Sequence, residues 1–590
     1  MKLNKKTDSS NASASAIQAA NQTAKGSRFQ WLPELLVIMV VVFGIQFALG
    51  GYSRDIATHS DEAAHFVTGA MVYDYCTMSL GSSPLAFAEE YYARYPKVAF
   101  GHWPPAFYGL QAVWFMIAGV SKTSITILMG LVSSLVVLVL YRRIRRNYGW
   151  GITLLTMLVF LGQPLVRTNT IVVMSDMTFT LFALLAVFAF RDFIVTEKNS
   201  HLVFCVVWSV FAMWTKPVGL SLILFLPLYV LVSRQISVLF DWKIWVAVAC
   251  VSLLTVPYYV GTRSQGLGMH GQSDLVQSAT RSVLLKPRNH ASDTLNKVVS
   301  VTVGVVAFIG AVPLFRRFRP VASEQECSAD LAVAISWSGA TLIFLFLVPI
   351  VSETRYLLPV LTGVMVLYAN GLHVILGGFK RNVGWGLVAG VVGVSVFFAP
   401  GRDLRIISGY AAAAGNVPSA GSGYVTLVSS DEVGEGAFIS ELKIRDQGLT
   451  EYVLRSSKVL GKSDWSGRRY RPIFATVDAL LEYVDSIPVH FILIDDCDYR
   501  WDTPLHHELL ETLVSKRPDQ FSLIATLPVQ FDGVQKANSV RIYENLAARG
   551  KPVTGFVVDM RSKIGRKIKV GNNSRIPTTR EDSTPQKTVD

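Results

Sequence analysis

The sequence predicts a polytopic α-helical membrane protein that ends in a soluble α/β domain. Of its 590 residues, 51% are hydrophobic and only 16% are charged, whereas soluble domains average about 25% charged residues. Long apolar runs recur up to residue 400, and shorter runs typical of strands follow them. We therefore expect a membrane domain at 31–400 and a separate α/β domain at 401–550.

The overall charge fits this class. The net charge is +13, from 55 basic and 42 acidic residues. Binding of nucleic acid could explain such an excess of positive charge, but membrane proteins also gather Lys and Arg in their cytoplasmic loops. We therefore expect no nucleic-acid partner. The five cysteines follow no metal-ligand or disulfide spacing, and no metal site is predicted from them.

Eleven apolar runs are candidates for membrane spans, because a helix needs roughly 20 apolar residues to cross a bilayer. They are 33–51, 123–141, 150–167, 174–191, 202–216, 218–233, 243–261, 298–315, 331–350, 355–377 and 383–400. The first 30 residues are polar and carry several lysines, which predicts a disordered cytoplasmic tail before an uncleaved first span.

A twelfth run, 104–120, is interpreted as an interfacial or re-entrant helix on the outer face. If it crossed the membrane, the basic clusters at 142–147 and 316–319 would both face outside. If it does not cross, both clusters are cytoplasmic, as the positive-inside rule requires. The same count places residues 401–590 on the extracytoplasmic side.

The region after residue 400 alternates strand and helix patterns, which predicts an α/β domain with a mostly parallel sheet. The expected strands are 424–430, 490–496, 521–530 and 539–546, and the expected helices are 476–486 and 504–516. The region after residue 400 lacks a glycine-rich phosphate loop, and the polar tail 551–590 is expected to be disordered.

The first motif, "HSDEAAHF" at 59–66, follows the first span. Its Asp61 and Glu62 begin a pattern typical of a helix lying in the membrane interface. One interpretation is that Ser60 or Asp61 caps that helix and Glu62 complements its dipole. The other is acid–base chemistry by this pair of carboxylates at the membrane face.

The second motif, "YPKVAFGHWPPAFYG" at 95–109, precedes the interfacial helix. Lys97 and His102 are suited to a lipid phosphate. The alternative is that the aromatic residues form a belt at the membrane interface and that the two prolines end a turn.

The third motif, "SETRYLLPV" at 352–360, opens a span. The guanidinium of Arg355 suits a phosphate, although pairing with Glu353 is an equally good explanation. Asp176 and Lys216 are ionisable groups near the same face, and such groups at membrane depth are functional candidates.

Taken together, these motifs resemble those of GT-C-fold membrane glycosyltransferases, the superfamily of protein O-mannosyltransferases and aminoarabinose transferases. The Asp-Glu pair, the His-Pro-Pro-type motif, the acidic residue of the second outer loop and the late "RYLLP" occur in the family's order across residues 30–400. Two departures occur: Trp103 separates His102 from the prolines, and Thr354 splits Glu353 from Arg355. The C-terminal domain lies outside the resemblance.

The resemblance implies transfer of a sugar, with inversion, from a polyprenyl-phosphate carrier to an extracytoplasmic lipid, polysaccharide or protein. Asp61 is then the general base and Glu62 orients the acceptor or shares that role. Cationic groups must stabilise the departing phosphate, and Arg355, Lys97 and His102 are the expected ligands.

The remaining site residues are expected to support the acceptor side; they are Asp176, Glu353, Tyr356 and Lys216. No cofactor is required, although a divalent cation is compatible with the carboxylates. The expected location is a bacterial-type inner or cell membrane, and membrane lipids are expected partners. A transporter or a non-catalytic envelope-binding membrane protein remains the alternative.

Cysteine labelling tests the predicted topology. A membrane-impermeant reagent should label a cysteine placed at position 464 in intact cells and leave one at position 145 unlabelled, because 142–147 is expected to be cytoplasmic. Strong labelling at 145 would make 104–120 a true span and reverse the assignment.

Overall fold

The computed structural model describes the chain from residue 31 to residue 569, with internal gaps. The described ranges are 31–99, 101, 103–264, 299–316, 322–347, 353–399, 406–418, 423–462, 470–496, 503–531, 538–553, 557–560 and 566–569. The predicted tail at 1–30 and the candidate His102 lie outside them.

The chain divides into two compact units. The membrane unit comprises residues 1–54 and 101–404, and the C-terminal unit comprises 55–100 and 405–590. These boundaries differ from the predicted ones, because the segment Asp55–Phe100, expected in the membrane domain, belongs with the C-terminal residues.

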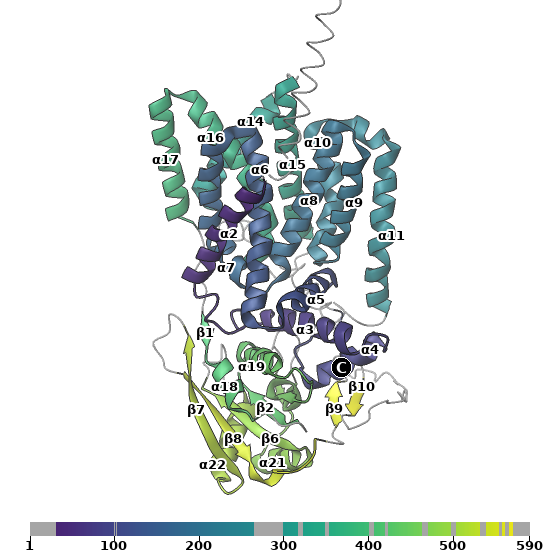
Figure 1. Ribbon diagram of the computed structural model, residues 1–590, viewed down its shortest axis with the longest axis vertical. Coiled ribbons are helices and arrows are strands. Elements are labelled where there is room, and N and C mark those ends of the chain that lie inside the picture. The colour runs from purple at the N-terminus through teal and green to yellow at the C-terminus, as the bar shows by residue number, and fades with distance from the viewer. Residues whose placement is uncertain are drawn as a thin grey trace, which may run out of the picture. The chain divides into compact units, whose positions relative to one another are not determined.

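The membrane unit is built from helices, which run side by side in Figure 1. They are α2 (Trp31–Ala48), α5 (Ala106–Ala118), α6 (Lys122–Gly162), α7 (Pro164–Ile171), α8 (Ser175–Thr196), α9 (Asn199–Met213), η1 (Pro217–Ser221), α10 (Leu222–Ser233), η2 (Ile236–Phe240), α11 (Trp242–Ser264), α14 (Val301–Arg316), α15 (Ala322–Leu347), η4 (Thr354–Leu357), α16 (Leu358–Gly378) and α17 (Arg381–Phe397).

Each of the eleven predicted spans falls on one or more of these helices. Among the described residues, six helices are long and apolar enough to cross a membrane, and further apolar helices are shorter. This confirms the predicted class of polytopic helical membrane protein.

Two predicted spans, 123–141 and 150–167, share the long helix α6. Gly149 separates its two parts with φ 72° and ψ 177°, a conformation that glycine adopts without a steric penalty. The second part ends earlier than predicted, at Gly162, because Pro164 begins the separate helix α7.

The helix α5 covers most of the predicted interfacial run 104–120. It has 13 residues, so it is about 20 Å long, short of the roughly 30 Å hydrocarbon core. Helix α9, which is predicted to span the membrane, is only two residues longer. Length alone therefore does not distinguish a spanning helix from an interfacial one, and the predicted topology rests on the loop charges.

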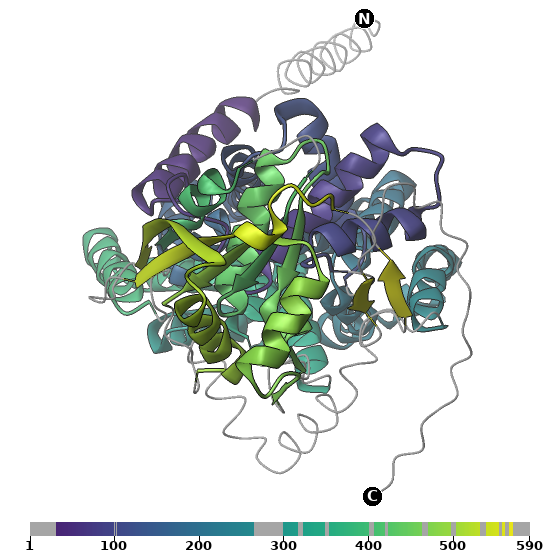
Figure 2. The same cartoon turned by 90° about the horizontal axis from the view of Figure 1, so that it is seen from below.

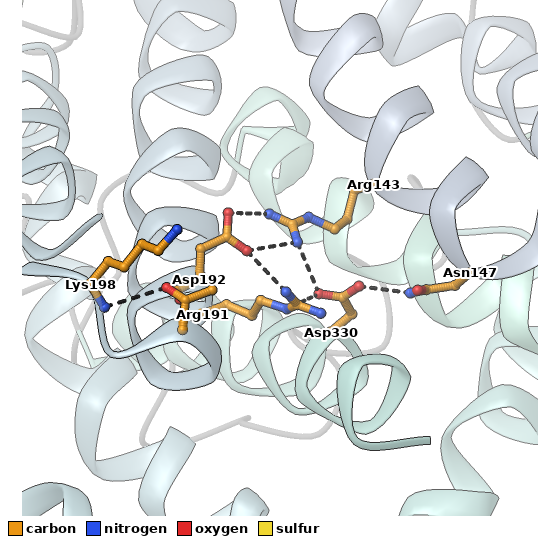
Figure 3. Close-up of polar contacts among 7 residues, drawn as sticks. Arg143, Asn147, Arg191, Asp192, Lys198 and Asp330 are labelled. Atoms are coloured by element: carbon orange, nitrogen blue, oxygen red, sulfur yellow. Dashed lines mark hydrogen bonds and ion pairs between the residues drawn. The ribbon is translucent and has the colours of Figure 1, made fainter. Parts of the chain in front are cut away.

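A network of charges links three helices at the C-terminal end of α8 (Figure 3). Both terminal nitrogens of Arg143 in α6 donate to Asp192 in α8, each over 3.0 Å. Arg191 in α8 pairs with Asp330 in α15 at 2.7 Å, and Asn147 also donates to Asp330. Because these charges are mutually paired, their desolvation is offset.

The C-terminal unit contains two helices of the first loop and a mixed α/β arrangement. Its elements are α3 (Glu62–Met78), α4 (Pro84–Arg94), β1 (Ile407–Ser408), α18 (Tyr410–Asn416), β2 (Val425–Ser429), α19 (Glu432–Arg445), β3 (Tyr452–Arg455), α20 (Ser456–Val459), β4 (Gly461–Lys462), β5 (Arg471–Pro472), α21 (Val477–Ser486), β6 (Val489–Asp495), α22 (Leu505–Lys516), β7 (Phe521–Phe531), β8 (Asn538–Asn545), η5 (Leu546–Ala548), β9 (Val557–Met560) and β10 (Arg566–Lys569).

The main sheet has the order β1-β7-β8-β6-β2-β3 and appears in green to yellow in Figure 2. The four predicted strands are β2, β6, β7 and β8, and the two predicted helices are α21 and α22. The predicted C-terminal domain of the α/β class is therefore confirmed.

The sheet is mixed, not mostly parallel as predicted. β2 pairs in parallel with β3 and β6, whereas β6–β8, β7–β8 and β1–β7 are antiparallel. The connection from Phe531 to Asn538 is short, and a parallel pair needs a crossover of a dozen or more residues. β7 and β8 therefore form an antiparallel pair.

The core of this sheet follows the two-residue period of strands. Val425 and Leu427 of β2 and Ile492 and Ile494 of β6 pack in one buried cluster with residues of α21 and α22. Within the tail expected to be disordered, β9 and β10 form an antiparallel hairpin.

Replacing Asp330 by Asn should destabilise the membrane unit by about 3–5 kcal/mol, because the two buried arginines then share a single carboxylate. The control is Glu34→Gln, which breaks the more exposed pair with Arg145 and should cost at most about 1 kcal/mol. Thermal unfolding in detergent measures both. Equal midpoints for the two variants would contradict a structural role for the network.

Candidate functional site

A buried ion pair lies at the N-terminal end of α8 in the membrane unit. Nζ of Lys216 is 2.5 Å from Oδ1 of Asp176, and the two residues are 5% and 2% exposed. Asp176 stands in the first turn of α8, and Lys216 occupies the break between α9 and η1, where Pro217 starts a new turn. The pair joins two predicted site residues that are forty positions apart.

The third motif contributes to the same cluster. Nζ of Lys216 lies 4.1 Å from the ring centroid of Tyr356, within the range of a cation–π contact. Nε of Arg355 is 2.5 Å from Oε2 of Glu353, and its Nη1 donates to Sδ of Met174, next to α8. Five predicted residues thus share this end of the membrane unit.

Several polar atoms of this cluster lack hydrogen-bond partners within the described part of the chain. They include Oδ2 of Asp176, Oγ of Ser175 and Nε1 of Trp214. Buried polar groups are nearly always satisfied, and each exception needs an explanation such as a bound ligand or water. The unsatisfied donors and acceptors of these atoms favour a ligand that carries hydroxyl groups, which both donate and accept hydrogen bonds.

Aromatic residues border the cluster. Trp214 ends α9, and its carbonyl accepts a hydrogen bond from the backbone nitrogen of Ala106 at the start of α5. The hydroxyl of Tyr258 in α11 donates to the carbonyl of Trp103. The part of the second motif from Trp103 to Ala106 therefore lies close to the end of α9 and to α11. Trp214 is not among the residues predicted from the sequence, although its position directly before "TKPVG", which contains Lys216, could have indicated that it lies near the site.

The first motif lies in the C-terminal unit. Asp61 stands at the N-cap of α3, but its backbone is in the αR region and its side chain makes no capping hydrogen bond. A typical N-cap has an extended backbone and a side chain that accepts from the first turn. The geometry therefore does not support a capping role for the Asp61 carboxylate.

The neighbours of Asp61 hold the turn before α3. Oε2 of Glu62 accepts a hydrogen bond from the backbone nitrogen of Thr58, and the side chain is fully buried. Nδ1 of His59 accepts from the backbone nitrogen of Asp61 and lies 3.8 Å from its Oδ2. These contacts define the position of the Asp61 backbone.

The Lys97 side chain is buried against helix α19. Its Nζ donates to the carbonyl of Glu432 over 2.9 Å. Burial lowers the pKa of Lys97 to about 7, and the neighbouring Arg455 guanidinium acts in the same direction, whereas Glu435 opposes it. Arg455 and Glu435 were not anticipated from the sequence, because they lie in the domain that the resemblance does not cover.

The structure separates the predicted site residues into two groups. The membrane unit gathers Asp176, Lys216, Glu353, Arg355 and Tyr356, and the C-terminal unit contains Asp61, Glu62 and Lys97. His102 lies outside the described residues.

Comparison with known families supports the resemblance predicted from the motifs. A profile of the family described as dolichyl-phosphate-mannose-protein mannosyltransferase matches residues 102–260. This range includes "HWPPAFY", Asp176 and Lys216, whereas Asp61 and Arg355 lie outside it. The chain is thus similar to membrane glycosyltransferases over this part. No curated protein sequence matches the chain significantly.

Solved structures match the chain at low sequence identity and low TM-score. ArnT from Cupriavidus metallidurans, in the apo state and bound to undecaprenyl phosphate, is 14% identical, with 88% of this chain and 98% of that chain covered and a TM-score of 0.40. The Archaeoglobus fulgidus oligosaccharyltransferase AglB, in complex with an inhibitory peptide and a dolichol-phosphate, is 11% identical, with 80% and 70% covered and a TM-score of 0.42. These scores are too low to support a conclusion about function.

A double-mutant cycle tests the pairing of Asp176 with Lys216. Lys216→Met should lower the free energy of unfolding by about 3–5 kcal/mol, because it leaves a buried carboxylate without its cation. Combining it with Asp176→Asn removes both charges and should restore much of that loss. Thermal unfolding in detergent measures the cycle. Additive losses in the double variant would show that the two groups are not coupled.

Proposed function

We propose that this chain is a membrane glycosyltransferase that moves a sugar from a polyprenyl-phosphate carrier to an extracytoplasmic acceptor with inversion. The main supporting observation is the buried Asp176–Lys216 pair, with Tyr356 and Arg355 beside it and one oxygen of Asp176 without a hydrogen-bond partner among the described residues. Ionisable groups at membrane depth are expensive and mark functional sites. The family profile, which covers this pair, supports the reaction class.

The proposed chemistry divides between base and cation. An acceptor hydroxyl has a pKa far above that of a carboxylate, so its deprotonation must accompany its attack on the anomeric carbon. Asp61 takes this proton, and Glu62 orients the acceptor. The bond to the carrier phosphate breaks as the new glycosidic bond forms, and the departing phosphate keeps the bonding pair.

The phosphate needs positive charge and no general acid. Arg355 supplies a planar guanidinium suited to two phosphate oxygens, and its bond to Glu353 keeps the side chain in one orientation. Lys97 and His102 are proposed as further phosphate ligands. Lys97 must first exchange its hydrogen bond to the Glu432 carbonyl.

The Asp176–Lys216 pair acts on the acceptor side in this proposal. The Asp176 oxygen that has no hydrogen-bond partner in the described part of the chain offers an acceptor to a substrate hydroxyl, and Lys216 neutralises the charge of that carboxylate. Tyr356 provides a ring face for a sugar. The reaction takes place on the extracytoplasmic face, in line with the predicted loop charges.

Asp61→Asn is the sharpest test of the base. Asparagine keeps the size of the side chain but accepts no proton, so the transfer rate should fall about 10²–10⁴-fold. The membrane level of the variant should be unchanged, because Asp61 makes no capping hydrogen bond. The matched control is Glu90→Gln in the same loop, an exposed carboxylate that should retain full activity. Full transfer activity in Asp61→Asn would remove the base assignment.

The donor assignment is tested with the purified chain in detergent. When the acceptor is supplied, a polyprenyl-phosphate sugar should be consumed, with transfer of the sugar to the acceptor and release of free polyprenyl phosphate, and a nucleotide sugar should not replace it. The assay contains EDTA, because no divalent cation is expected to be required. Transfer from a nucleotide sugar would overturn the donor class, and activity restored only by an added metal would overturn the metal-independent chemistry. In proteoliposomes, movement of the lipid across the bilayer without release of free polyprenyl phosphate would favour a transporter.

A further inference from the structure

Helix α19 of the C-terminal domain packs directly against α3, which carries the first motif. The backbone also joins the two segments. The nitrogen of Asp55 donates to the carbonyl of Ile407 over 2.8 Å, and the Asp55 carboxylate accepts from the nitrogens of Gly409 and Tyr410. Residues more than 350 positions apart thus form one packed unit.

The closest approach occurs at Gly436 of α19. A Cβ atom built at this position would lie 2.9 Å from Cβ of Ala63 and 3.0 Å from Cε of Lys97. Glycine has a lower helix propensity than alanine, so helix stability does not favour it here. The close packing favours glycine, because a larger side chain at position 436 would clash with Ala63 and Lys97. Ala63 follows Asp61 by two positions, and Lys97 is part of the second motif.

Polar contacts surround this point. Nζ of Lys97 donates to the carbonyl of Glu432, and Nη1 of Arg455 donates to the carbonyl of Pro96 over 3.3 Å. Arg455 is held in turn by Glu435, with Nε 2.7 Å from Oε2. The first turns of α19, together with Arg455 of β3, therefore hold the Pro96 backbone and the Lys97 side chain.

A second anchor lies two turns further along α19. Nζ of Lys443 is 3.1 Å from Oδ2 of Asp74 in α3, and both side chains are about 2% exposed. The hydroxyl of Tyr91 in α4 donates to the same Asp74 oxygen, and the Tyr95 hydroxyl donates to Asp446. Gly436 and Lys443 are seven residues apart, so they share one face of α19. That face is held against α3 at both points.

We propose that α19 is the positioning element that holds the Asp61 and Lys97 segments in place for transfer, with Gly436 as the contact point and Lys443 as the anchor. The inference rests on the proposed function, and it gives the C-terminal domain a role in the same reaction. Gly436 and Lys443 are positioning residues, because they contact the motif segments and not the substrate.

A general base must stand within hydrogen-bond reach of the proton that it removes. Carbon atoms in contact prefer about 3.5–4.0 Å, so an added Cβ at position 436 pushes Ala63 away by about 1 Å. A misplacement of that size costs up to about 10²-fold in rate. The substrate-binding groups of the membrane unit are untouched, so the loss should fall on kcat.

The experiment compares Gly436→Ala with the double variant Gly436→Ala/Ala63→Gly, in which the clashing methyl group is removed. The single variant should lose about 10–100-fold in kcat with little change in KM for the donor. The double variant should recover to within about threefold of the parent. Gly415→Ala in α18, where an added Cβ meets nothing within 4 Å, is the matched control and should behave as the parent.

Hydrogen exchange of residues 59–70, measured on the same preparations, provides a readout that does not depend on activity. Exchange should rise in Gly436→Ala and return to the parent level in the double variant. An active parent whose Gly436→Ala variant keeps both kcat and protection would overturn the positioning role and leave the proposed function standing. A parent without transfer activity would overturn the proposed function, and the exchange data would still decide whether α19 positions the motif.

Discussion

The pairing of buried charges along α8 is the constraint on which the membrane unit depends. This chain buries several ionised side chains among apolar helices, and each would cost several kcal/mol if it were left alone. Asp176 near the start of α8 binds Lys216, and Asp192 sixteen residues later binds Arg143 and Arg191. At 1.5 Å per residue the two sites are about 24 Å apart, so α8 is held near both of its ends by partners from other helices.

The two ends differ in a way that separates structure from function. At the Asp192 end, every arginine and carboxylate is ion-paired within the network of Figure 3. Nε of Arg191 and Oδ1 of Asp330 make no hydrogen bond to a described residue, but they face each other as an ion pair at 2.7 Å. At the Asp176 end, one carboxylate oxygen and the neighbouring Ser175 hydroxyl have no partner among the described residues. A network built only for stability would satisfy these atoms, because each unmet hydrogen bond costs about 1–3 kcal/mol. The incomplete end is therefore the better candidate for substrate.

Local patterns predicted the elements well and their partners less well. Apolar run length located the spans, and alternation located β2, β6, β7 and β8, since both signals depend only on neighbouring residues. Helix α19 was not predicted because Gly434 and Gly436 lower its helix propensity and because its buried stretch from Gly434 to Lys443 mixes polar with apolar residues, so no apolar stripe stands out in the sequence. The direction of β7 depends on a tight connection, and the union of Asp55–Phe100 with the C-terminal residues depends on contacts across 350 positions. Neither leaves a periodic signal. The pairing of Asp176 with Lys216 was anticipated only as a shared face.

The position of α19 explains why a domain outside the family resemblance is joined to the resemblance's first two motifs. Asp61 stands at the N-cap of α3. The helix carries the buried polar residues Glu62, His65 and Asp74, and it cannot be stable alone because these groups need partners. The C-terminal domain supplies the partner of one of them, because Lys443 neutralises Asp74, and Arg455 and the Glu432 carbonyl hold the Pro96–Lys97 turn. The glycine at 436 then lets two helix backbones approach where any side chain would separate them. A domain added for acceptor binding alone would have no need of that contact, so the fit between Gly436 and Ala63 indicates that the first loop and α19 are adapted to each other as one structural unit.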